Sequence, residues 1–258
     1  MGYFNVTVKP TVPASKQHTG NFSAQDVLFD WVAFDIPRGG AKLLGATVLV
    51  RPKGNAGPTA NPFGCFLVFS KTNNTSLGTV NSGAANVPSN DFIGHVEIED
   101  TTSYAAALPS TSVGVSGRAS NNSNQHPSLV FARDYDSDVM AHQADGVAAN
   151  VGYDRFYMGG LAEGEFDFET IIRINDDDIA SSSPGTTLVT DGSSMDIQEH
   201  FIKGDVLHAH DDAVIGTVAS VTNSTTLELT EAIATSVLAA DDYVYNIHPI
   251  RVILHFEQ

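Results

Sequence analysis

Residues 165–174 read Glu-Phe-Asp-Phe-Glu-Thr-Ile-Ile-Arg-Ile, and residues 250–256 read Ile-Arg-Val-Ile-Leu-His-Phe. Both stretches are rich in β-branched and aromatic residues. The first alternates acidic with apolar side chains before it becomes apolar, which is the pattern of a long strand entering a core. Together they predict two core strands of one body built from β-sheets. The segment between them, 176–247, differs in composition and is predicted to be an insert.

The insert opens with three aspartates at 176–178 and a Ser-Ser-Ser-Pro-Gly breaker at 181–185. Short strands joined by tight turns at regular spacing are typical of a small barrel. The apolar runs that carry this pattern are 201–207, 214–221, 226–230 and 241–247. We therefore predict a β-sandwich from residues 1–175 plus 248–258, and a small β-barrel from residues 176–247.

The rest of the chain favours strands joined by turns. A Pro-Arg-Gly-Gly turn at 37–40 separates two apolar stretches, and residues 92–98 alternate as a half-buried strand would. Only 139–151 has the composition of a short helix, and Phe156 and Tyr157 are predicted to open a glycine-rich turn. Strands are expected at 27–34, 43–50, 62–70 and 92–98. The predicted fold is all-β, an antiparallel β-sandwich with the small barrel near the C-terminus, and both jelly-roll and immunoglobulin-like topologies remain open.

Charge is distributed unevenly along the chain. The formal net charge is −17, with 12 acids against 10 bases in 1–160 and 18 acids against three bases in 161–258. Such a field repels phosphate backbones, so direct nucleic-acid binding is not expected. The sequence has no apolar run long enough to span a membrane and no signal-peptide pattern, which predicts synthesis in the cytoplasm and no membrane contact. The single cysteine, Cys65, is expected to be a small buried hydrophobe.

Two groups of residues resemble metal sites. Asp134, Asp136, Asp138 and Asp145 fall at positions 1, 3, 5 and 12 of a calcium-loop spacing. A valine stands where the loop needs glycine, and Asp145 replaces the longer bidentate glutamate, so an acidic turn is favoured over a calcium site. His208 and His210, beside Asp211 and Asp212, lack a third ligand at fixed spacing. We expect neither a metal nor another cofactor.

No pattern for catalysis stands out. The sequence has no nucleophile elbow, no His-Glu-x-x-His helix and no phosphate-binding glycine loop, so a non-enzymatic protein is predicted. Trp31 is interpreted as a core residue rather than a sugar-stacking platform. An exposed patch for partner binding is predicted at Tyr153, Arg155, Phe156 and Tyr157.

Two stretches resemble known virion proteins. Lys-Gly-Asp-Val-Leu at 203–207, with Ile-Gly-Thr-Val-Ala-Ser-Val-Thr-Asn-Ser-Thr-Thr-Leu-Glu-Leu-Thr at 215–230, resembles a small β-barrel unit that recurs in virion proteins of tailed bacteriophages. The stretch 26–40, Asp-Val-Leu-Phe-Asp-Trp-Val-Ala-Phe-Asp-Ile-Pro-Arg-Gly-Gly, is similar to structural proteins of tailed phages of marine bacteria, cyanophages among them.

The resemblance implies a non-enzymatic virion structural protein located in the virion. Its implied role is a capsid decoration or cement protein that binds the major capsid protein or other virion proteins. We expect a homo-oligomer, with an acidic insert that keeps crowded copies soluble and a near-neutral sandwich that meets the partner. The alternative is a tail or fibre module that binds a receptor or carbohydrate.

Overall fold

The structure is a computed structural model that describes residues 2–18, 20–50, 64–83, 90–98, 129–133, 152–165, 167–168, 172–174, 185–191, 197–233 and 242–258. These residues form two four-stranded sheets and one five-stranded sheet, and the neighbouring strands in each sheet are antiparallel. The predicted fold class, an all-β antiparallel sandwich with a small barrel near the C-terminus, is confirmed.

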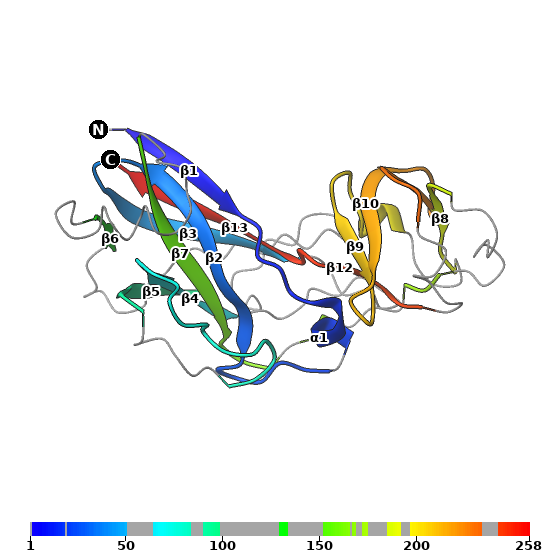
Figure 1. The fold of residues 1–258 in the computed structure, drawn as a ribbon, viewed down its shortest axis with the longest axis horizontal. Coiled ribbons are helices and arrows are strands. Elements are labelled where there is room, and N and C mark those ends of the chain that lie inside the picture. The colour runs from blue at the N-terminus through cyan, green and yellow to red at the C-terminus, as the bar shows by residue number, and fades with distance from the viewer. Residues whose placement is uncertain are drawn as a thin grey trace.

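The two four-stranded sheets face each other and form the sandwich (Figure 1). In spatial order, the first sheet contains β1 (Tyr3–Val8), β13 (Ile250–Glu257), β3 (Ala41–Val50) and β6 (Val130–Phe131). The second contains β2 (Val27–Pro37), β7 (Tyr153–Ala162), β4 (Cys65–Ser70) and β5 (Phe92–Ile98). Numbered along the chain within the sandwich alone, these orders are 1-8-3-6 and 2-7-4-5. This is the strand order of a jelly roll, so the jelly-roll alternative is the one observed.

The predicted turn between the first long strands does not form a hairpin. β2 ends at Pro37 in one sheet and β3 begins at Ala41 in the other, so the turn carries the chain across the sandwich. Gly39 and Gly40 have φ angles of 110° and 86°, a left-handed region that favours glycine. The turn lies at the end of the sandwich that also holds both chain termini, where the Gln258 side chain donates a hydrogen bond to the Arg38 carbonyl.

Phenylalanine rings from both sheets meet in the middle of the sandwich. Phe131 contacts rings on β2, β4, β7 and β13, with centroids 5.2–5.8 Å away, and is fully buried. The geometries are edge-to-face, the arrangement that the charge distribution of aromatic rings prefers. The rings that surround it are Phe34, Phe69, Phe156 and Phe256. Because β6 has only two residues, this ring is its main attachment to the core.

The glycine-rich turn predicted after Phe156 and Tyr157 is wrong, because Tyr153–Ala162 is one continuous strand, β7. Gly159 and Gly160 lie within it for steric reasons rather than as breakers. A Cβ at Gly160 would lie 2.3 Å from a ring carbon of Phe29, and one at Gly159 would lie 2.7 Å from a methyl of Leu77. The two glycines therefore give bulky side chains room on opposite faces of the sheet.

Arg133 fixes the point where β7 extends past its neighbour β4. β4 ends at Ser70 opposite Tyr157, so the Arg155 carbonyl lies beyond the end of that pairing. The Arg133 guanidinium donates hydrogen bonds to this carbonyl and, at 2.8 Å, to the carbonyl of Lys71, and it lies 5.2 Å from the Phe156 ring centre. A side chain that is only 8 % exposed thus links the end of β4 to β7 through two backbone carbonyls.

The third sheet forms the small barrel at the far end of the molecule from the termini (Figure 1). In spatial order it contains β12 (Val244–Asn246), β9 (Val206–Ala209), β10 (Val214–Val221), β11 (Thr226–Leu229) and β8 (Thr187–Val189), and a short 3-10 helix, η3 (Ile197–Glu199), follows β8. Residues 172–174 lie between the two edge strands. Arg173 bridges Tyr243, beside β12, and Ile174 bridges Thr190, beside β8, so this segment closes the open side of the sheet.

The long core strand predicted over 165–174 is wrong. Phe168 packs in the sandwich core, whereas Ile172 and Ile174 pack in the barrel core. The described residues of this stretch form isolated bridges with the barrel instead of a strand of the sandwich. The expected boundary at residue 176 therefore comes after two residues of the barrel core. The helix predicted at 139–151 lies outside the described residues.

Candidate functional site

The four residues predicted to form an exposed patch have different environments. Tyr153 is 52 % exposed at the start of β7, but Phe156 is fully buried and Tyr157 is 4 % exposed. Arg155 forms a bidentate ion pair with Asp35 across the β2–β7 ladder, with N–O distances of 2.9 and 3.1 Å. The prediction of an exposed aromatic patch is wrong for Phe156 and Tyr157, because β7 is a central strand with both faces covered. Tyr153 remains a candidate for partner contact.

Trp31 packs beneath the loop that follows β4. Its indole N–H donates a hydrogen bond of 3.0 Å to the Thr75 carbonyl, and the ring packs beside a cluster of Val27, Val68 and Leu77. Asp30 accepts hydrogen bonds from Ser76 and from the Leu77 amide and so holds the loop against the sheet. The ring is therefore part of the packing between sheet and loop, in line with the core role predicted for it.

Cys65 is fully buried at the start of β4. Burial, with a smaller contribution from the charge of Glu163, raises the pKa of its thiol far above the ordinary value. Since the thiolate is the reactive form, this cysteine is chemically inert in the folded protein. The expectation of a small buried hydrophobe is confirmed.

The histidines of the barrel do not converge on one point. His208 Nδ1 lies 3.0 Å from the Asp212 carbonyl oxygen, whereas His210 Nδ1 lies 3.5 Å from a carboxylate oxygen of Asp242. Among the described residues, no three His, Cys, Asp or Glu side chains are grouped so that they could hold a metal ion. The calcium-like aspartates, Asp134, Asp136, Asp138 and Asp145, lie outside the described residues.

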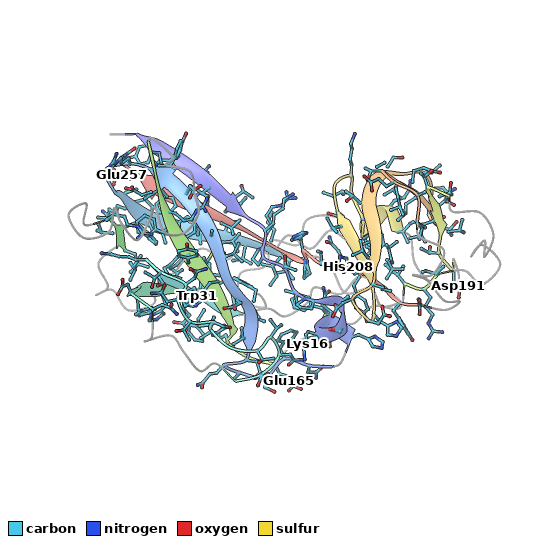
Figure 2. The ribbon with its side chains drawn as sticks, in the orientation of Figure 1. Lys16, Trp31, Glu165, Asp191, His208 and Glu257 are labelled. Atoms are coloured by element: carbon cyan, nitrogen blue, oxygen red, sulfur yellow. The ribbon has the colours of Figure 1, made fainter. Side chains whose placement is uncertain are left out.

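A short helix, α1 (Ala14–His18), connects the sandwich to the barrel (Figure 2 labels Lys16 on the helix and His208 on β9). The Asp212 carboxylate accepts hydrogen bonds from the amide of Ser15, at 2.9 Å, and from its hydroxyl, at 2.5 Å. The Gln17 side chain, 3 % exposed, donates to the carbonyls of Val12 and Asn246. Both ends of the helix are thus hydrogen-bonded to the barrel.

Aromatic side chains complete this junction. His18 Nδ1 lies 2.8 Å from the Tyr245 hydroxyl, and its ring centre lies 5.0 Å from that of Tyr243 and 5.1 Å from that of His210. Arg173 covers the other part of Tyr243, with its guanidinium 4.7 Å from the ring centre and a hydrogen bond to the hydroxyl. The barrel is therefore attached to the sandwich by directional contacts as well as by the chain.

Sequence reasoning missed this junction because nothing local indicates it. In the sequence Asp212 stands out only as a neighbour of His208 and His210, and the Ser15 that it binds lies 197 residues away. The five-residue helix is too short to produce a detectable periodicity. Only the cluster of histidines and tyrosines near the end of the barrel segment could have pointed to this site.

His248 lies between β12 and β13, with its Nε2 atom 3.3 Å from the Thr11 hydroxyl. Burial, then the positive charge of Lys9, lowers the pKa of its imidazole, and Asp205 partly opposes the shift. A histidine with a lowered pKa in the folded state takes up its proton more readily when unfolded. Its contribution to stability is therefore present above the ordinary histidine pKa and is lost as the pH falls through and below that value.

We expect the melting temperature to fall as the pH is lowered from about 7.5 to about 5.5, and the fall to be smaller in His248→Gln. Calorimetric melting of both proteins at several pH values measures the two slopes. Equal slopes in the two proteins would contradict a role for His248.

Most exposed large apolar side chains lie on the sandwich, and several stand at the end away from the barrel. Tyr3, Phe92 and Tyr153 begin β1, β5 and β7, and Val130 begins β6. Their exposed fractions run from 44 % to 72 %. This end of the sandwich, together with the nearby turn at 38–40, is the candidate site for contact with a partner.

Comparison with known proteins does not assign this chain to a family: no family model matches the sequence, and no curated protein matches it. Within the described residues, no helix has the length and apolar character needed to cross a membrane.

Proposed function

We propose that the chain is a non-enzymatic structural protein of a phage virion, which decorates the capsid by binding the major capsid protein. The single observation that carries the proposal is the placement of the acidic barrel in the last crossover of a jelly roll, at the opposite end from the termini (Figure 1). This arrangement gives the molecule one end suited to contact and one suited to solvent.

Charge supports the same orientation. The part from 161 to 258, which includes the barrel, carries 18 acids against three bases, whereas the part from 1 to 160 carries 12 against 10. An acidic lobe that points into water keeps neighbouring copies apart and soluble, and a near-neutral end meets a protein surface without strong repulsion. Jelly rolls serve as coat domains in many viruses but also as lectins, so the fold adds support without deciding the function.

Binding to a capsid would depend on the surface area buried in each contact and on the number of equivalent sites in the lattice. A specific protein contact needs about 1,000 Å² or more of buried surface, and a lattice presents many equivalent sites that multiply weak contacts. The exposed Tyr153 and Phe92 at the end away from the barrel are the aromatic anchors we expect at such a contact. Their partners on the capsid would be apolar pockets with few acidic groups.

The experiment is a binding assay with empty capsids of the phage that encodes the protein. We expect the purified chain to sediment with the capsids and to raise their melting temperature by several degrees, because a ligand of the assembled state stabilises it. Tyr153→Asp and Phe92→Asp should each weaken binding roughly tenfold. The matched control is Val214→Asp, which changes a side chain of similar exposure on the barrel.

Failure to sediment, with unchanged capsid melting, would reject decoration. Labelling of intact particles confined to the tail would point instead to the tail or receptor-binding alternative.

A further inference from the structure

The two outer faces of the sandwich are not equally covered. Over the β2-β7-β4-β5 sheet, the loop after β4 packs Leu77, fully buried, against Val27 and Val68. On the β1-β13-β3-β6 sheet, the outward side chains of Tyr3, Val130 and Leu44 are 72 %, 63 % and 46 % exposed. We call this second surface the open face. It carries three of the seven large apolar side chains that the described residues leave exposed.

The open face carries an ordered row of side chains across all four strands. Tyr3 on β1 pairs with Glu257 on β13, Glu257 pairs with Lys42 on β3, and Lys42 pairs with Val130 on β6. Cross-strand partners point to the same side of a sheet, so the row reads apolar, acidic, basic, apolar. If a second copy of the row lies against the first in the opposite direction, each acidic residue faces a basic one. Each apolar residue then faces the apolar residue at the other end of the row.

The next residues on this face are arranged in a fixed geometry. His255 Nδ1 lies 2.9 Å from the Asn5 Oδ1 atom, and its Nε2 lies 3.0 Å from the Thr47 hydroxyl. Asn5 Oδ1 only accepts and the hydroxyl can donate, so the neutral ring with hydrogen on Nδ1 satisfies both contacts. Side chains on three strands are thus linked in one arrangement, which suits rigid packing against another surface.

We propose that the open face binds a second copy of this chain, in a dimer whose two-fold axis lies between the sheets and runs along the strands. Rotation about such an axis reverses the order of the strands, so β1 faces β6 and β13 faces β3. Tyr3 then packs on Val130 of the other copy, and Glu257 lies opposite its Lys42. An isologous contact needs a self-complementary surface of this kind.

The charge of the open face makes it a better place for contact between two copies than the rest of the surface. The whole chain carries a net charge of −17, so copies repel each other over most of their surface. The outward charged residues of the open face are Lys42, Arg251 and Glu257, which leaves the face with a small positive excess. A two-fold axis along the strands places both acidic barrels at the same end of the dimer, so added salt should strengthen association by screening their repulsion.

The size of the face sets the expected strength. The four strands have six, eight, ten and two residues, so at about 3.3 Å per residue and about 4.8 Å between strands they cover about 400 Å² per copy. A total near 800 Å² belongs to the weakest class of specific interfaces, so we expect a dissociation constant on the order of 100 µM. The proposal does not depend on capsid decoration, because it concerns the free protein.

Sedimentation velocity of the full chain over a range of concentrations on both sides of that value tests the proposal. The average mass should rise from 27.3 kDa toward twice that value as concentration increases. Val130→Glu should weaken association by about tenfold or more, because the two-fold axis places the substitution at two equivalent contacts. Val214→Glu, the same change on the barrel, should leave association unchanged.

Charge reversal tests the predicted row itself. Lys42→Glu places two glutamates opposite each other across the interface and should weaken association, whereas Lys42→Glu combined with Glu257→Lys should restore it. Unchanged melting temperatures would show that each variant is folded. A wild-type mass that stays at 27.3 kDa throughout, or equal behaviour of Val130→Glu and Val214→Glu, or a double variant no better than the single one, would overturn the proposal.

Discussion

Replacing Phe131 with alanine is expected to lower the free energy of unfolding of the sandwich by about 3–5 kcal/mol, the usual cost of removing a buried phenylalanine ring. The ring is fully buried and contacts aromatic rings from both sheets at centroid distances of 5.2–5.8 Å. It also attaches β6 to the core. The surrounding rings belong to four different strands and cannot close the cavity together.

The chain provides its own reporter for this measurement. Its single tryptophan, Trp31, lies on β2, so denaturant unfolding followed by tryptophan fluorescence reports on the sandwich rather than on the barrel. Phe92→Ala is the matched control, because Phe92 is 44 % exposed and its loss should cost less than about 1 kcal/mol. Similar losses in the two variants would contradict the central position assigned to Phe131.

Gly160→Val is expected to destabilise the sandwich by about 3 kcal/mol or more, at the upper end of the usual overpacking cost. A Cβ at this position would lie 2.3, 2.5 and 2.8 Å from three ring carbons of Phe29. Phe29 is fully buried, so its ring has no free space to enter. The substitution must therefore displace the ring or separate β2 from β7.

A double-mutant cycle isolates this contact. Phe29→Leu shortens the side chain that blocks position 160, so Gly160→Ala should cost clearly less in the Phe29→Leu background than in the wild type. Gly164→Ala is the control, because no atom lies within 4 Å of a Cβ at that glycine. Additive losses in the cycle would show that the ring does not exclude larger residues from position 160.

The strands that sequence could predict are those whose pattern is local. Residues 250–256 have alternating burial in β13, and residues 92–98 form β5 within the predicted limits. Hydrophobic alternation reports how a strand is buried, but it does not report which strand lies beside it. The pairing of Tyr3 with Glu257, and hence the jelly-roll order, joins opposite ends of the chain and leaves no local signal.

The predictions were wrong where one stretch contributes to both the sandwich and the barrel, and where glycines lie inside a strand. The stretch 165–174 alternates convincingly, yet Phe168 lies in one core and Ile172 in another, because the chain crosses between bodies there. Gly159 and Gly160 indicated a turn by composition, whereas bulky neighbours require them in β7. In the candidate contact site, Tyr153 is exposed as predicted. Phe156 is buried because β7 lies between β2 and β4, and this strand order cannot be read from the local sequence.

The position of the protein on the particle is the central claim, and a low-resolution reconstruction of the virion tests it most directly. The account predicts repeated two-lobed density on the outside of the head lattice, with the larger lobe, the sandwich, against the shell and the smaller barrel lobe pointing outward. A reconstruction whose head lattice carries no such density, with antibody label found only on the tail or absent from the particle, would contradict it.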